Sequence, residues 1–215
     1  MSRGRPRDPA RQQASKQALR LAAQQLLEQK PYRSISIREL AQQAGTQSAM
    51  VSYYFGSKEG LFLDLLQHSG EQRQQRLQQL GLRIQAQPDQ AIALLVDNLV
   101  ELMASEPWLV RLLQDEVLSQ QSALRNGFMQ AIPDRLKQGL LALFQQLIRQ
   151  GVLRADLNPG YMVASLMSLV VFPLLAEPVM SQVLNIDRNT IVSDEWKHHL
   201  TLVLTQGLAP GGETA

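Results

Sequence analysis

Apolar residues recur at helical spacing along most of this chain, and this pattern restricts the fold more than any other feature of the sequence. Leu19, Ala23 and Leu26 share one side of a helix, because 3.6 residues complete a turn. Leu, Ala and Gln dominate the composition, whereas Val and Ile rarely form the alternating runs typical of strands. The sequence therefore predicts an all-α protein.

Capping residues and glycines delimit several short helices near the N-terminus. Ser36 and Glu39 have the spacing of a capping box, in which each side chain bonds to the other residue's backbone. Gly45 suits the left-handed turn that follows, and a short helix is predicted over about 47–54. Ser57 is placed to cap the next helix. Two short helices joined by a tight turn, packed on a longer preceding helix, predict a helix-turn-helix unit.

The pattern predicts a flexible arm and two domains. Residues 1–12 form a basic arm, 13–73 a three-helix DNA-binding domain with its helix-turn-helix at about 36–55, and 74–215 a larger helical domain for ligand binding and dimerisation. In the larger domain, Asn158 and Pro159 have the residue types favoured at the cap and first position of a helix.

Charge is distributed unevenly between the two parts of the chain. Residues 1–60 hold ten Lys/Arg and four Asp/Glu, a net charge of +6, whereas the remainder has a net charge of −4. A basic segment of this kind indicates a polyanionic partner. Arg3 and Arg5 in the arm can enter a narrow A·T minor groove, or the arm can be a nonspecific basic tail. Both readings predict salt-dependent binding to double-stranded DNA.

Several enzyme classes lack their usual residues in this sequence. It contains no cysteine, no Gly-rich phosphate loop and no GxSxG motif. The three histidines, His68, His198 and His199, form no HExxH motif. We therefore expect a protein that is not an enzyme and has no catalytic residues, metal or cofactor. An architectural DNA-binding protein without ligand control is the main alternative, and the large acidic second domain argues against it.

No signal peptide or membrane span is expected. The N-terminus carries basic and polar residues without an apolar segment behind them. The longest uncharged apolar stretch, 161–176, is shorter than a membrane-spanning helix and contains Ser165, Ser168 and Pro173. The absence of cysteine fits a reducing compartment. The predicted location is the cytoplasm.

The short helix after Gly45 has the character of a DNA recognition helix. If Val51 and Phe55 form its buried edge, the opposite face is formed by Ala49, Met50, Ser52 and Tyr53. Gln47 and Ser48 lie at the N-terminal tip, from which side chains reach base edges. A glutamine can bind adenine through two hydrogen bonds, and small apolar groups can contact a thymine methyl group.

Tyr53, Tyr54 and Lys58 lie at the other end of this helix and are predicted to bind phosphate. Tyrosine hydroxyls suit phosphate oxygens. A lysine in the first turn of a helix faces the positive end of the helix dipole, which is unfavourable unless an anion is present. Tyr54 is also expected to be partly in the core, and Lys58 can instead be an ordinary solvated side chain.

The segment SISIRELAQQAGTQSAMVSYYFGSKEGLFLDLL resembles the DNA-binding domain of TetR-family bacterial transcription regulators. The matching features are the Ser-Ile-Arg-Glu-Leu-Ala run, the Ala-Gly turn, the Tyr-Phe helix end and the Lys-Glu helix start. The resemblance implies an all-α homodimer whose last two helices form a four-helix interface, with a small-molecule cavity in the larger domain. By position it implies DNA contacts for Ser36, Arg38, Gln47, Ser48, Ala49, Met50, Ser52, Tyr53, Tyr54 and Lys58.

Gln47 and Ser52 depart from the family pattern, which usually has Ser and Tyr at these positions. Thr46 is then an alternative cap for the recognition helix, and the base preference should differ from that of other members.

In the larger domain, methionines and aromatic residues are candidates for lining an adaptable apolar pocket, although most should be core. The predicted pocket residues are Met103, Trp108, Phe128, Met129, Phe144, Met162 and Met167, and further candidates are Tyr161, Phe172, Met180 and Trp196. An exposed apolar stripe would be a liability in a monomer, which predicts a dimer interface. Its predicted residues are Leu166, Leu169, Val170, Leu200, Val203 and Leu204.

Together these patterns predict a ligand-responsive dimeric transcription regulator, with repression favoured over activation. Two-fold symmetry predicts a palindromic operator with half-site centres ~34 Å apart or slightly more. A small-molecule effector would favour a dimer whose recognition helices no longer match that spacing.

Overall fold

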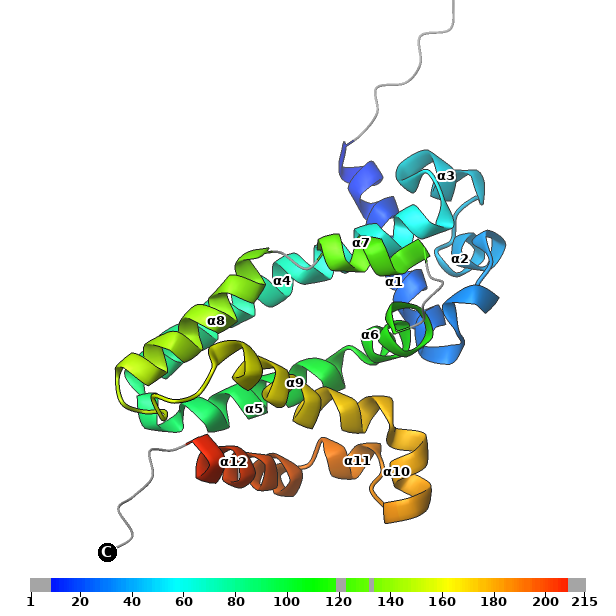
Figure 1. Ribbon diagram of the computed structural model, residues 1–215. Coiled ribbons are helices and arrows are strands. Elements are labelled where there is room, and N and C mark those ends of the chain that lie inside the picture. Colours follow the sequence, from blue (N-terminus) through cyan, green and yellow to red (C-terminus); the bar gives the residue numbers. More distant parts are fainter. Residues whose placement is uncertain (1–8, 119–122, 132–133, 209–215) are drawn as a thin grey trace, which may run out of the picture. The chain divides into compact units, whose positions relative to one another are not determined.

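A computed structural model describes residues 9–118, 123–131 and 134–208 (Figure 1). These residues contain helices and no strand, which confirms the predicted all-α class. The α-helices are α1 (Pro9–Gln29), α2 (Ile37–Gln43), α3 (Ala49–Phe55), α4 (Lys58–Ala86), α5 (Ala91–Ser105), α6 (Pro107–Leu112), α7 (Ala123–Ala131), α8 (Asp134–Arg149), α9 (Pro159–Leu175), α10 (Glu177–Leu184), α11 (Arg188–Ile191) and α12 (Asp194–Leu208). Short 3₁₀ helices η1 (Tyr32–Ser34) and η2 (Pro88–Gln90) and a π-helical segment η3 (Leu113–Val117) complete the order.

The helix ends form where local chemistry predicts them. Gly45 has φ 63°, the left-handed conformation that glycine adopts without a Cβ penalty. The Ser57 hydroxyl accepts a hydrogen bond from the Gly60 N–H at 3.0 Å, which caps α4. The Asn158 side chain accepts hydrogen bonds from the first turn of α9, and Pro159 is the first residue of that helix.

The first compact unit comprises Met1–Ser69 and Arg111–Ala131. It holds α1, α2, α3 and the first part of α4, and α2 packs on both α1 and α3. Arg20 of α1 is nearly buried, and its Nε donates to the Asp64 carboxylate of α4 at 2.6 Å. The apolar core of this unit includes Leu19, Leu27, Ile35, Leu40, Val51, Leu61, Phe62, Leu65, Leu66 and Leu124.

The second unit comprises Gly70–Val110 and Ile132–Ala215. Its central helix is α5, which packs against both α9 and α12, while α8 packs on α9 (Figure 1). The Lys197 ammonium of α12 donates to Asp97 of α5 at 2.8 Å. Residues 111–131 belong with the first unit, so no single boundary in the sequence separates the two units. The predicted domain boundary after residue 73 stays a prediction.

No single helix among the described residues is long and apolar enough to cross a membrane. Together, α9 and α10 reach the required length and apolarity, but they are bent by 77° at the break between them.

Two glycines of α4 offer a matched test of the turn between α3 and α4. A Cβ added at Gly60 would collide with the Phe55 carbonyl group, whereas one added at Gly81 meets nothing within 4 Å. Gly60→Ala should therefore lower the free energy of unfolding by about 1–3 kcal/mol through overpacking. Gly81→Ala should raise it by about 0.5–1 kcal/mol, since glycine is costly inside a helix. Urea unfolding followed by circular dichroism measures both, and equal effects would contradict the steric argument.

Candidate DNA-binding surface and effector pocket

The helix-turn-helix begins with a complete capping box at α2. The Ser36 N–H donates to Glu39 Oε2 at 2.9 Å, and the Glu39 N–H donates to the Ser36 hydroxyl at 3.2 Å. The Lys30 ammonium also donates to the Glu39 carboxylate. Hydrogen bonds from Lys30, and then from Ser36, lower the pKa of Glu39 from 4.5 to about 2. Glu39 therefore joins the end of α1 to the start of α2.

The turn after α2 and the buried Val51 fix the position of α3. The Thr46 N–H donates to the Ala41 carbonyl at 2.8 Å, and Val51 is fully buried. The α-helix begins at Ala49 rather than at Gln47, because the Met50 N–H bonds back to the Gln47 carbonyl in a three-residue turn. The expected side-chain cap from Thr46 is not formed, and Ser48 occupies the N-cap position without a side-chain capping bond.

Most of the predicted DNA-contact residues are exposed, so α3 has a face that the first unit's core does not use. Met50, Tyr54 and Lys58 are half-buried. Arg3 and Arg5 lie outside the described residues. The exposed residues are Ser36, Arg38, Gln47, Ser48, Ala49, Ser52 and Tyr53.

The two tyrosines of α3 pack against each other. Their ring centroids are 5.0 Å apart in an edge-to-face arrangement, and Tyr54 also contacts Phe55 edge to face. Tyr53 is 51% exposed, whereas Tyr54 is half-buried, as the sequence predicted. Tyr54 thus restricts the orientation of Tyr53 at the end of the exposed face.

Lys58 makes contacts that the sequence did not reveal. Its ammonium donates to the backbone carbonyls of Tyr32 at 3.0 Å and Ile35 at 2.9 Å, and lies 4.1 Å from the centroid of the Tyr32 ring. These acceptors offset the unfavourable helix dipole without any bound anion. Burial lowers the pKa of Lys58, and the nearby Glu116 carboxylate partly opposes this shift. An ammonium has three N–H donors; two are used here, and contact with a phosphate stays a prediction.

Glu116 is a buried acid beside this cluster, and sequence reasoning missed it. Only 3% of its side chain is exposed, and it accepts a hydrogen bond from Arg33 Nε at 3.0 Å. Burial is the main cause that raises the pKa of Tyr32 to about 12, with further contributions from the carboxylates of Glu59 and Glu116. Glu116 lies in η3, far along the chain from Arg33, so no local spacing could have identified it.

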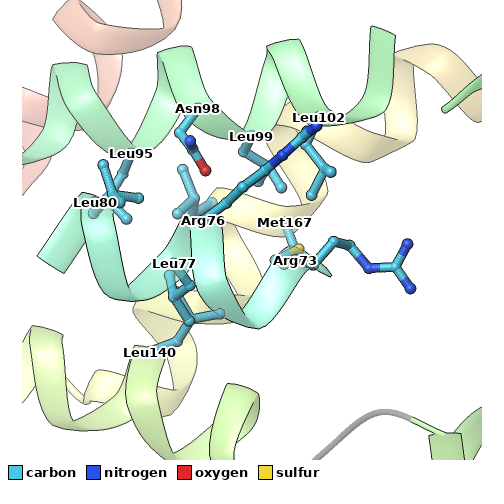
Figure 2. Close-up of a pocket in the computed structure, with 11 residues that line it drawn as sticks. Arg73, Arg76, Leu77, Leu80, Leu95, Asn98, Leu99, Leu102, Leu140 and Met167 are labelled. Atoms are coloured by element: carbon cyan, nitrogen blue, oxygen red, sulfur yellow. The ribbon is translucent and has the colours of Figure 1, made fainter. Parts of the chain in front are cut away.

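The second unit contains a pocket between α4, α5, α8 and α9, with a cavity volume of about 80 Å³ (Figure 2). Its wall is largely leucine. The lining residues are Arg73, Arg76, Leu77, Leu80, Leu95, Asn98, Leu99, Leu102, Leu140, Leu166 and Met167.

This lining shares only Met167 with the predicted pocket set. Most of the other predicted side chains fill cores: Met103, Trp108, Phe144 and Met162 are buried. Phe128 and Met129 belong to the first unit, where Phe128 is half-buried and Met129 is 64% exposed. Among the further candidates, Tyr161 and Phe172 are exposed, while Met180 and Trp196 are half-buried. Leucines at helical spacing, rather than flexible or aromatic residues, surround this cavity, and the predicted pocket set stays a prediction.

Most of the predicted dimer residues are buried within this chain, and the predicted interface stays a prediction. Leu166, Val170, Leu200 and Leu204 are buried within this chain, because α9 and α12 both pack on α5. Leu169 is half-buried and Val203 is 46% exposed. The exposed apolar side chains of these two helices are instead Tyr161 and Phe172 on α9 and Leu202 and Val203 on α12.

The fold and the exposed α3 define a helix-turn-helix transcription regulator with a second helical domain. Residues 15–65 match the family profile described as bacterial regulatory proteins, tetR family, and residues 88–203 match the tetracyclin repressor-like C-terminal domain. The chain belongs to the TetR family of transcription regulators. No curated protein matches its sequence.

Solved structures of several regulators have the same fold. The transcriptional regulator FadR from Bacillus subtilis, in complex with stearoyl-CoA, is 17% identical with a TM-score of 0.72, over 89% of this chain and 98% of that one. HlyIIR, a hemolysin II transcriptional regulator, is 19% identical with a TM-score of 0.66, over 93% and 99%. NalD, the secondary repressor of the MexAB-OprM multidrug efflux pump in Pseudomonas aeruginosa, is 21% identical with a TM-score of 0.60, over 93% and 99%.

The lowered pKa of Glu39 predicts an acid-sensitive start of the helix-turn-helix. The carboxylate contributes stability above pH 4.5, and this contribution is lost as the pH falls from 4.5 toward about 2. Glu39→Gln should therefore lower the melting temperature at neutral pH, and its difference from the wild type should shrink below pH 4.5. Thermal unfolding from pH 7 to pH 3 measures this. A difference that stays constant over the range would show that the charge of Glu39 does not stabilise the fold.

Proposed function

We propose that the protein is a homodimeric repressor that binds a palindromic operator through α3 and leaves it when a small-molecule effector binds. The observation that carries the proposal is the exposed face of α3, which is anchored through Val51 while Gln47, Ser48, Ala49 and Ser52 remain free of the core. These side chains are short or neutral, so a DNA major groove can approach the helix closely.

Phosphate contacts on either side of α3 would set its orientation. Arg38 on α2 and Tyr53 at the end of α3 are exposed and have donors that suit phosphate oxygens. The excess of basic residues in 1–60 adds sequence-independent attraction to DNA. We assign base reading to the N-terminal tip of α3 and phosphate binding to the flanking residues. We further propose a cytoplasmic location, where a bacterial regulator meets its DNA.

The pocket favours a regulator with ligand control over an architectural DNA-binding protein. An architectural protein has no use for an apolar cavity within a separate helical unit, whereas an effector needs one. FadR of Bacillus subtilis was solved in complex with stearoyl-CoA, which supports ligand binding by this fold. The effector would act by favouring one of two dimer arrangements.

Selection of bound sequences from random DNA tests the proposal, followed by a metabolite panel applied to the selected complex. A palindromic consensus that at least one metabolite releases supports the repressor. A palindrome released by no metabolite would favour the architectural alternative, and no enrichment at low salt would reject sequence-specific binding.

Gln47 and Lys58 should affect DNA binding in different ways. Gln47→Ala should relax one base position of the selected site, since a bidentate amide contact is worth about 1–3 kcal/mol of discrimination. Lys58→Ala should weaken binding to all DNA sequences alike. It should also reduce the slope of log affinity against log salt concentration by about one.

Because Lys58 also holds the Tyr32 and Ile35 carbonyls, lost affinity alone does not assign a phosphate contact to it. The slope of log affinity against log salt concentration distinguishes the two roles. An unchanged slope in a folded Lys58→Ala protein would show that Lys58 does not contact a phosphate. An identical consensus from Gln47→Ala and wild type would remove Gln47 from base reading.

The exposed faces of α9 and α12 should form the dimer interface. Phe172 is 63% exposed, and a charge in its place would be buried without a partner in a dimer. Phe172→Glu should therefore cost about 2 kcal/mol or more of association, roughly a 30-fold weaker dimer. Leu82→Glu, at a position 67% exposed on α4, is the matched control and should leave the dimer unchanged. Light scattering over a dilution series measures both, and equally stable dimers would place the interface elsewhere.

A further inference from the structure

The apolar part of the pocket restricts the shape of what can enter it. Eight of its eleven lining residues are leucine or methionine. The cavity volume is about 80 Å³. An engineered cavity of ~150 Å³ holds one benzene ring, so this space suits a slim hydrocarbon chain better than a ring system. Leucine and methionine side chains can also rotate to admit a longer chain.

The three polar lining residues are not equivalent. The Arg73 side chain is 13% exposed, and its Nη1 lies 2.6 Å from the Glu106 carboxylate, which is 14% exposed. Figure 2 shows the Arg73 guanidinium turned away from the leucines. Its charge is therefore compensated within the protein, and Arg73 contributes mainly its aliphatic stem to the wall.

Arg76 adds a second positive charge beside this ion pair. Burial is the main cause that lowers the pKa of Arg73 and raises the pKa of Glu106. The charge of Arg76 adds to the first shift and opposes the second, which places it close to the two groups. Arg76 is exposed, and Figure 2 shows its side chain extending from α4 toward α5. Among the described residues, no carboxylate lies within ion-pair distance of its guanidinium. Arg76 therefore contributes a positive charge to the lining of the pocket.

We propose that the effector is an amphipathic monoanion: its hydrocarbon chain lies among the leucines, and its carboxylate binds Arg76. This inference rests on the proposed function, in which the pocket is the effector site. A guanidinium binds a carboxylate through two parallel hydrogen bonds. A cationic head would be repelled by Arg76, and a neutral head would leave the guanidinium charge without a partner.

Isothermal titration of the full-length protein tests the charge requirement with three ligands of equal chain length, each below its micellar concentration. These are decanoate, 1-decanol and decyltrimethylammonium. Decanoate should bind at least about tenfold more tightly than the other two, since a charged hydrogen bond is worth more than a neutral one. Equal affinities for decanoate and 1-decanol would overturn the proposal. Binding of decanoyl-CoA without binding of decanoate would also overturn it, because the thioester has no carboxylate.

Substitutions on α4 test the residue assignment. Arg76→Met keeps a linear apolar side chain and should weaken decanoate binding about tenfold while leaving 1-decanol unchanged. Arg76→Lys should retain much of the affinity. Arg83→Met, on the same helix but outside the pocket, is the matched control and should bind like the wild type. Unchanged decanoate affinity in a folded Arg76→Met protein would overturn the assignment.

Release from the selected operator, measured separately, distinguishes this inference from the proposed function. One outcome is that decanoate shows the predicted affinities and yet leaves the DNA complex intact. That result would support the ligand class and would show that such ligands do not release the DNA. A different metabolite that releases the DNA, together with no binding of decanoate, would reject the ligand class and leave the repressor in place.

Discussion

The helix-turn-helix depends on one contact, the hydrogen bonds from the Lys58 ammonium to the carbonyls of Tyr32 and Ile35. These carbonyls belong to the segment between α1 and α2, in which the Tyr32 carbonyl also accepts the Ile35 N–H at 3.1 Å. A half-buried carbonyl without a donor is costly. Lys58 supplies the donors from the first residue of α4 and so ties the start of that helix to the approach to α2. The buried Val51 and the capping box of Ser36 and Glu39 then position α3 through contacts with nearby residues.

The acid that accompanies this contact comes from a distant part of the chain. Glu116 is buried in η3 and pairs with Arg33 of η1, so a segment from the middle of the sequence neutralises charge around residues 32–58. Only the acid of this pair is buried, because the Arg33 side chain is 64% exposed. The position of residues 111–118 is thus linked to the same backbone segment that Lys58 holds.

The sequence predicted the parts of the molecule that short-range chemistry determines. The capping box at Ser36, the left-handed Gly45 and the exposed tip of α3 each depend on residues within a few positions of one another. The predictions that match the observed burial less well concern helices that are apolar on more than one side. Leu166 and Leu200 could have faced a partner or this chain's own α5, and periodicity alone cannot separate these cases. Leu77 and Leu99 looked like ordinary core residues, and only the helix arrangement leaves a cavity between them. The acceptors of Lys58 were missed for the same reason.

The pocket and the proposed dimer surface share one helix. Leu166 and Met167 of α9 line the cavity, whereas Tyr161 and Phe172 of the same helix are exposed. Helices move largely as rigid bodies when a packed neighbour is displaced, because close-packed interiors deform little. A ligand longer than the present cavity would therefore displace α9 as a unit, and the displacement would reach the Phe172 face. In the proposed dimer that face would set the angle between two subunits, so a displacement of α9 by a ligand would change this angle.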